Sequence, residues 1–123
     1  MIDDRTEALF LPDGDAYVAT TLAQGPWSAE HQHGGAVSAL LAHVVEQVPT
    51  LVPMRVGRLT VELMRPVPVA RLGATTRIVR EGKRIQLVET ALLADDVEVA
   101  RATALRVRIG SSPEAIDHPR RPL

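Results

Sequence analysis

The sequence predicts an α+β domain in which an antiparallel β-sheet wraps around one long central α-helix. Three observations lead to this prediction. Residues 36–48 form one long and almost wholly apolar helical pattern. Four segments of alternating apolar and polar residues follow it, and short turns join the last three, which is typical of an antiparallel meander. One apolar helix can cover the concave face of a twisted sheet, and such a helix itself needs cover on more than one side.

The composition excludes several classes of protein. The 123 residues suffice for one domain with its own core, and the net charge of −1 gives no general attraction to nucleic acid or membranes. Aromatic residues make up only 2% of the chain, so the core must be aliphatic and stacking on nucleic-acid bases is not expected. The absence of cysteine excludes disulfides, a thiolate nucleophile and cysteine-ligated metals.

The chain shows no sign of export or membrane insertion. Met1 is followed by Ile2-Asp3-Asp4, which is acidic, whereas a secretory signal begins with basic residues. No apolar run approaches the roughly 18 residues of a membrane span. We therefore expect a soluble, cytoplasmic protein with neither a membrane nor a nucleic-acid partner.

The expected elements follow in chain order. An apolar patch at residues 9–12 precedes a turn signal at residues 12–14, and residues 15–23 are predicted to form a strand. The helix predicted over residues 36–48 has few polar positions, and prolines follow its end. Four strands are predicted after the helix, at residues 55–65, 74–80, 84–94 and 98–109.

The last two predicted strands each carry their larger apolar residues on one side. These residues are Ile85, Leu87, Ala91 and Leu93 in the first of the two strands, and Val99, Thr103, Leu105, Val107 and Ile109 in the second. After Gly110 the chain becomes rich in proline and includes Arg120-Arg121. Residues 1–110 are therefore predicted to form the domain, and residues 111–123 a tail or linker.

A polar loop at residues 27–33 ends in two glycines and leads directly into the helix. Paired glycines at a helix start leave backbone N–H groups uncovered by side chains, at the positive end of the helix dipole. Such a start can hold a carbonyl, an oxyanion or a phosphate.

Four short segments carry a resemblance to a known family. These are His33-Gly34-Gly35-Ala36, Leu63–Pro68, Arg80–Arg84 and Ala100–Ala104. In this order and spacing they resemble the hot-dog-fold acyl-CoA thioesterases, and above all the N-terminal hot-dog domain of the thioesterase II-like branch. The resemblance covers residues 15–109 and implies a single hot-dog domain.

The resemblance also implies an activity and a site. Members of the family hydrolyse acyl-CoA thioesters, and an amide N–H at the helix start polarises the thioester carbonyl. On this chain that N–H would belong to Gly35 or Ala36, with His33 and Gly34 beside the substrate. Sites in the family form between two hot-dog units, either in a homodimer or between two fused domains, so this single domain is expected to form a homodimer or a higher oligomer. Coenzyme A would be present only as part of the substrate, no separate cofactor is expected, and fatty acid metabolism is the implied context.

The chain departs from the family pattern where a catalytic carboxylate is expected. That position, about two turns into the helix, holds Leu41-Ala42-His43, and the first carboxylate is Glu46. His43 and Glu46 are therefore the candidates for catalysis, although a hydrogen-bonded core histidine and a solvent-facing helix-end carboxylate are the ordinary alternatives. Ser38 and Thr60 have the chemistry to orient a water molecule.

Two functions remain open from the sequence. The first is thioester hydrolysis, and the second is a non-catalytic domain that binds or scaffolds acyl thioesters without a general base of its own. Hydratase chemistry on the same fold is disfavoured, because the helix does not open with an aspartate and a histidine five residues apart.

The remaining charged and metal-ligating residues give two further expectations. Arg80, Lys83 and Arg84 lie at a predicted hairpin turn, where they would contact the phosphates of coenzyme A or simply face solvent. His31 and His33 are two residues apart, but no third ligand is evident, so no metal site is expected.

Overall fold

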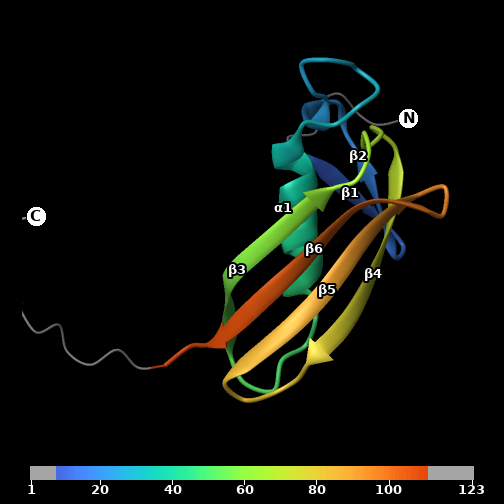
Figure 1. The fold of residues 1–123 in the computed structure, drawn as a ribbon. Helices are drawn as coiled ribbons and strands as arrows, with labels where there is room; N and C mark the ends of the chain where they lie inside the picture. The colour runs from blue at the N-terminus through green and yellow to red at the C-terminus, as the bar shows by residue number, and fades with distance from the viewer. Residues whose placement is uncertain (1–7, 111–123) are drawn as a thin grey trace, which may run out of the picture.

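The computed structural model describes residues 8–110. All six strands of this part of the chain lie in one antiparallel sheet, in the order β1-β2-β4-β5-β6-β3. The sheet curls around one helix (Figure 1), which is the hot-dog arrangement expected from the resemblance. The elements are β1 (Phe10–Asp13), β2 (Ala16–Ala19), the 3-10 helix η1 (Thr21–Ala23), α1 (Gly34–Glu46), β3 (Met54–Leu63), β4 (Arg71–Arg80), β5 (Ile85–Ala94) and β6 (Val97–Arg108).

The strands after the helix pair as the sequence predicts. β4, β5 and β6 form a meander of neighbouring antiparallel strands. β3 lies on the far side of β6, because α1 carries the chain across the sheet before β3 begins. The two edges of the sheet are therefore β1, which is short and contains Pro12, and β3, which spans ten residues.

The strand predicted at residues 15–23 is confirmed only over β2, and its last residues form η1 instead. The strand β1 before it was not predicted; it forms a hairpin with β2 that turns at Gly14, in a left-handed conformation with φ of 58°. The strand direction ends at Thr20, because its hydroxyl accepts a hydrogen bond from the Leu22 N–H and starts η1. The same hydroxyl donates to the carbonyls of Ala8 and Leu9, which ties the start of β1 to this corner.

Helix α1 begins and ends two residues earlier than predicted. One face packs into the sheet, and it presents the buried residues Ala36, Val37, Leu40, Leu41, Val44 and Val45. The opposite face is exposed in the described chain, although the His43 ring on it contacts Tyr17 of β2. We call this exposed face the open stripe, and it consists of Gly35, Ala39, His43 and Glu46. The sheet therefore surrounds the helix less completely than the apolar pattern suggests.

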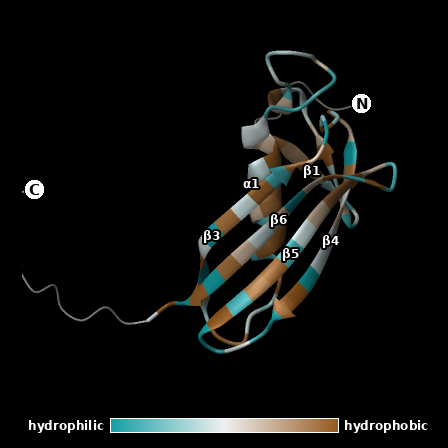
Figure 2. Ribbon diagram, in the orientation of Figure 1, coloured by the Kyte–Doolittle hydropathy of each residue, from teal (hydrophilic) through white to brown (hydrophobic). Residues whose placement is uncertain are grey.

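The two faces of β5 and β6 are the reverse of what residue size indicates. The residues turned toward α1 on β6 are small, and Ala100, Ala102 and Ala104 are all buried. On β5 the buried residues are Gln86, Val88, Thr90 and Leu92. Most of the larger side chains at the intervening positions lie on the outer face and stay partly exposed, whereas Val99 is buried in the core. Figure 2 shows hydrophobic and hydrophilic residues alternating along the strands. The small alanine side chains on the inward face of β6 let the helix approach the sheet closely.

The C-terminal end of α1 is held by a buried arginine. The Arg106 side chain is only 7% exposed, and its Nη1 donates to the carbonyls of Val45 at 3.3 Å and Val48 at 2.7 Å. The same nitrogen donates to Oε1 of Gln86 at 3.2 Å. A cation is favoured at this end of a helix, where carbonyl groups lack partners. The predicted tail at residues 111–123 lies outside the described residues.

Candidate acyl-thioester site

The loop before α1 is fixed between two other segments of backbone. On one side, the Gly25 N–H donates to the His31 carbonyl at 2.7 Å. On the other side, the Gln32 N–H donates to the Val67 carbonyl at 2.8 Å, and the Gln32 side-chain amide donates to the Pro68 carbonyl at 2.8 Å. A side chain at Gly25 would meet the backbone of residues 31–33 at 3.3–3.4 Å, so the strands of this loop approach too closely for a Cβ. These contacts set the position of the helix start.

His33 is the N-cap of α1. Its Nδ1 accepts a hydrogen bond from the Ala36 N–H at 3.1 Å, and its carbonyl accepts from the same N–H at 3.2 Å. The imidazole therefore lies over the first turn, where a Cβ on Gly35 would come within 3.1 Å of Nδ1. The predicted role of Ala36 as a donor to substrate conflicts with this geometry, because its N–H already has two acceptors. Glycine at position 35 leaves room for the histidine cap.

Two backbone donors remain open at the helix start. Gly34 and Gly35 are both exposed, and within residues 8–110 their N–H groups have no hydrogen-bond partner. They point along the positive end of the helix dipole, and no acidic side chain lies in the first turn. This pair of donors can hold a carbonyl oxygen or a developing oxyanion.

The predicted catalytic side chains lie away from these donors. His43 and Glu46 are exposed on the open stripe, eight and eleven residues after Gly35. At a rise of about 1.5 Å per residue, they are about 12 Å and about 17 Å from Gly35 along the helix axis. His43 is not a core histidine; its ring stands edge-on to Tyr17, with centroids 5.6 Å apart. Thr60 lies on the outer face of the sheet, so it does not approach the helix start.

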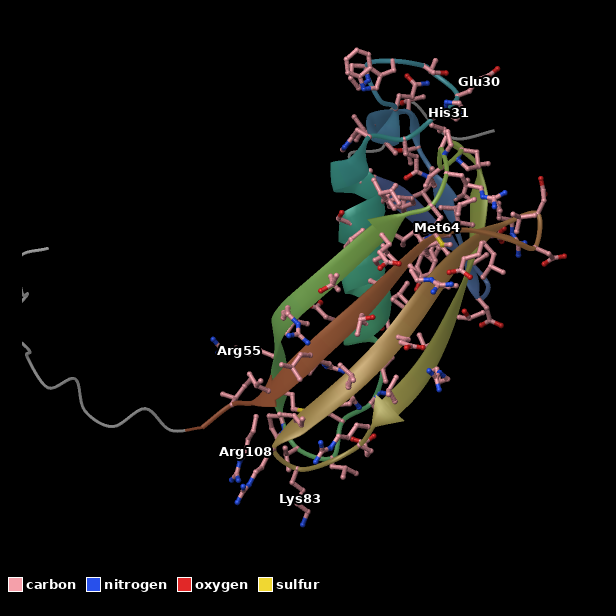
Figure 3. All side chains as sticks on the ribbon, viewed as in Figure 1. Glu30, His31, Arg55, Met64, Lys83 and Arg108 are labelled. Atoms are coloured by element: carbon pink, nitrogen blue, oxygen red, sulfur yellow. The ribbon has the colours of Figure 1, made fainter. Side chains whose placement is uncertain are left out.

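The predicted phosphate-binding residues gather at the opposite end of the molecule. Arg80, Lys83 and Arg84 are exposed around the β4–β5 turn. Figure 3 shows Lys83, Arg55 and Arg108 at that end, whereas Glu30 and His31 lie at the end with the helix start. Among the described residues, none of these five cations forms an ion pair. Because α1 spans thirteen residues, the start and the end of this helix are about 20 Å apart along its axis.

The outer face of the sheet carries a polar hollow of about 430 Å³. Its charged groups pair with one another: Arg77 with Glu89 at 2.7 Å, and Arg101 with Glu98 at 2.6 Å. The hydrogen bond from Arg101 lowers the pKa of the Glu98 carboxyl. Both arginines of the hollow are thus already paired, the further charged residue in its lining is the acidic Glu62, and the hollow lies on the face of the sheet turned away from α1.

A second hollow lies between the β1–β2 hairpin and α1 and has a volume of about 330 Å³. The sequence did not indicate it, because the hairpin itself was not predicted. Its signal was the apolar patch at residues 9–12, which supplies part of the lining. Within residues 8–110, no three histidine or carboxylate side chains come close enough to bind a metal, and no helix is long and apolar enough to span a membrane.

A curved antiparallel sheet around one helix defines the class of hot-dog domains. A family profile described as the acyl-CoA thioesterase N-terminal domain matches residues 23–107. The chain therefore belongs to this family. No curated protein matches the sequence.

Solved structures agree with the fold. A candidate thioesterase related to phenylacetic acid degradation, from Ralstonia eutropha JMP134, is 26% identical with a TM-score of 0.65; the match covers 75% of this chain and 72% of that one. A Bacillus halodurans protein solved with CoA is 24% identical with a TM-score of 0.65, covering 84% and 74%. A candidate thioesterase II from Thermobifida fusca YX is 15% identical with a TM-score of 0.62, covering 90% of this chain but 42% of that one. This chain thus matches less than half of the last protein.

Proposed function

We propose that the protein binds acyl-CoA thioesters and hydrolyses them, with the thioester carbonyl held by the N–H groups of Gly34 and Gly35. The observation that carries the proposal is the open pair of donors at a helix start, in a chain that belongs to an acyl-CoA thioesterase family. Donors fixed before the reaction stabilise the oxyanion of the tetrahedral intermediate more than the ground-state carbonyl. Water would add to the carbonyl carbon, the carbon–sulfur bond would break, and the thiolate of coenzyme A would take up a proton.

The general base in this proposal comes from a second copy of the chain. His43 and Glu46 are too far from Gly35 to act on a carbonyl held by the same copy. The free edge of β3 and the open stripe beside it are the surfaces on which a second copy would bind. A two-fold axis would run the two β3 strands antiparallel, so the C-terminal end of one helix would approach the start of the other. Glu46 is then the first candidate for the base, and His43 the second.

The cations at the β4–β5 turn fit the same arrangement. Arg80, Lys83 and Arg84 are exposed and lie around the β4–β5 turn, at the end of the molecule opposite to the helix start of their own chain (Figure 3). We propose that they contact the phosphates of coenzyme A bound at the helix start of the neighbouring copy. Their lack of internal ion pairs leaves their charge free for an anionic ligand.

A binding domain without catalysis is the second candidate function. This function is favoured because the first two turns of α1 contain no carboxylate. The first acidic residue of the helix is Glu46, in its last turn. In this case the donors of Gly34 and Gly35 hold the carbonyl, and no group activates water.

Hydrolysis of a panel of acyl-CoA thioesters, followed as release of free thiol, separates the two functions. We expect turnover well above the uncatalysed rate and a dimeric mass by light scattering. Glu46→Gln and His43→Gln, compared in the same assay, identify the base. Binding of acyl-CoA by calorimetry without any turnover would establish the non-catalytic function, and absence of both would overturn the proposal.

A further inference from the structure

The apolar hollow beside α1 lies between two elements that are far apart in the sequence. The hairpin and the residue before it contribute Leu9, Phe10, Pro12 and Tyr17, while the helix contributes Ala39, Leu40 and His43. Most of the surface that lines it is apolar. The two lining residues with polar side-chain groups are Tyr17 and His43, whose rings pack edge to face at 85°. We call this hollow the hairpin groove.

The hairpin groove runs alongside the helix face that carries the candidate site. Gly35, Ala39 and His43 follow one another at intervals of four residues, so they lie on one face of α1, and all three are exposed. Ala39 is about 6 Å and His43 about 12 Å from Gly35 along the axis. The groove therefore begins one helical turn beyond the open donors and ends at the ring pair.

The size of the groove limits what it can hold. Its volume of about 330 Å³ is at the low end of the roughly 300–1,000 Å³ that is usual for small-molecule sites. The lining is mostly apolar, with Tyr17 and His43 as its polar side chains, so a charged or strongly polar ligand would lose more hydration than these two groups can replace. A short apolar group, entering from the direction of Gly35, meets both conditions.

We propose that the hairpin groove is the acyl pocket, that it selects short apolar acyl groups, and that Tyr17 and His43 set the length limit. This inference rests on the proposed function, because the acyl chain enters the groove only when its carbonyl is held at Gly34 and Gly35. Ala39 is the specificity-determining residue at the mouth, since its small side chain keeps the path along the helix open. The acyl group lies along the helix toward His43, so the coenzyme A portion leaves in another direction.

The proposal predicts a dependence of affinity on chain length. Each methylene buried in the groove contributes about 0.8 kcal/mol, which corresponds to about a fourfold gain in affinity. The gain continues until the chain end reaches Tyr17 and His43, and longer chains then gain nothing or bind less well.

The test uses S-alkyl thioethers of coenzyme A of increasing chain length, with affinity measured by calorimetry. Thioethers are not hydrolysed, so the readout does not depend on catalysis. For the wild-type chain we expect about a fourfold gain per methylene for the short chains and then a plateau. Ala39→Leu fills the mouth and should remove this gain, while binding of unsubstituted coenzyme A is kept. Ala70→Leu makes the same change at an exposed residue outside the groove and should behave as the wild type.

A second variant keeps the test decisive if Ala39→Leu alters more than the groove. Phe10→Ala enlarges the pocket and should move the plateau to longer chains. Affinity that is independent of chain length, with coenzyme A still bound, would overturn the acyl pocket but not the proposed function. Loss of all coenzyme A binding in the wild-type chain would overturn both. An unchanged chain-length profile in Ala39→Leu, with or without dissociation of the dimer, would show that Ala39 does not line the path of the acyl group, which also overturns the acyl pocket.

Discussion

The two ends of helix α1 face the same physical problem and are treated in opposite ways. Each end of a helix leaves backbone groups without partners inside the helix. At the C-terminal end, the guanidinium of Arg106, a residue only 7% exposed, donates to the carbonyls of Val45 and Val48, and the buried amide of Gln86 donates to the carbonyl of Pro49. At the N-terminal end, only the Ala36 N–H is capped, and Gly34 and Gly35 keep their donors open to solvent.

The difference indicates which end stabilises the fold and which end serves a ligand. Placing an arginine inside a protein requires its charge to be compensated by close polar partners, and such a residue is kept where the fold depends on it. Leaving donors bare at the other end forgoes the stabilisation of about 1 kcal/mol that a further cap typically supplies. Substitutions at the two ends should therefore separate activity from stability.

The largest expected effect is on activity, at the open end. Gly35→Pro removes one N–H donor within the first turn, where proline is compatible with a helix. Loss of an oxyanion donor typically lowers kcat by about a hundred- to a thousandfold. We expect a fall of this size in thiol release, with a helical circular-dichroism spectrum retained.

Gly35→Ala is the matched control for this substitution. It introduces the same Cβ, which would lie 3.1 Å from the His33 ring, but it keeps the N–H. Both variants should therefore disturb the His33 cap, and only the proline should abolish the donor. Equal hydrolysis rates for the two variants would contradict the oxyanion role of Gly35.

The next largest effect is on stability, at the C-terminal end of α1. Arg106→Met keeps the aliphatic part of the side chain but leaves the carbonyl of Val48 and the Oε1 of Gln86 without their donor, whereas the carbonyl of Val45 still accepts from the Val48 N–H. Buried acceptors without partners cost about 1–3 kcal/mol, so we expect a loss of about 2–3 kcal/mol in the free energy of unfolding. For a domain of this size the unfolding midpoint should fall on the order of 10 °C.

Arg108→Met is the control for this loss, because Arg108 is an exposed arginine two residues further along β6. Its replacement should change the midpoint little. Activity per folded molecule should be unchanged in both variants. An Arg106→Met protein as stable as Arg108→Met in denaturant titrations would show that the buried hydrogen bonds are not required.

The same contrast explains what the sequence could predict. The helix, the meander after it and the bare glycines are local patterns of spacing and residue type, and all three were predicted. The loop residues around Gly34 and Gly35 carry their own signal, because two glycines before an apolar helix have few other uses. The open end of α1 was therefore largely legible from the sequence.

The C-terminal end of α1, which Arg106 covers, could not be predicted, because it depends on which face of the sheet packs against the helix. Residue size alone favours the side of β6 with Leu105 and Val107 as the one that packs against the helix. In the structure, the helix packs on Ala100, Ala102 and Ala104. Arg106 shares the inward face with these alanines, but an arginine in a strand ordinarily indicates solvent. Which side of β6 faces the helix depends on the distance between helix and sheet, and that distance is a property of the tertiary structure. The β1–β2 hairpin was missed for a related reason: Pro12 disfavours a strand except at an edge, and edge position is not encoded locally.

The smallest effect concerns the cations near the closed end, and it tests whether they serve the open end of another copy. Replacement of Arg80, Lys83 and Arg84 together by glutamine should weaken coenzyme A binding on the order of tenfold, since each exposed charge contributes modestly.

This triple variant and Gly35→Pro should each be impaired as homodimers. Mixed dimers formed by refolding the two together contain one site with both sets of residues intact, if the cations act across the interface. Activity of the equimolar mixture should then rise to about a quarter of the wild-type value, because half of the dimers are mixed and each has one intact site. If the cations act within their own chain, neither site of a mixed dimer is intact, and the mixture should show no more activity than the average of its two parents.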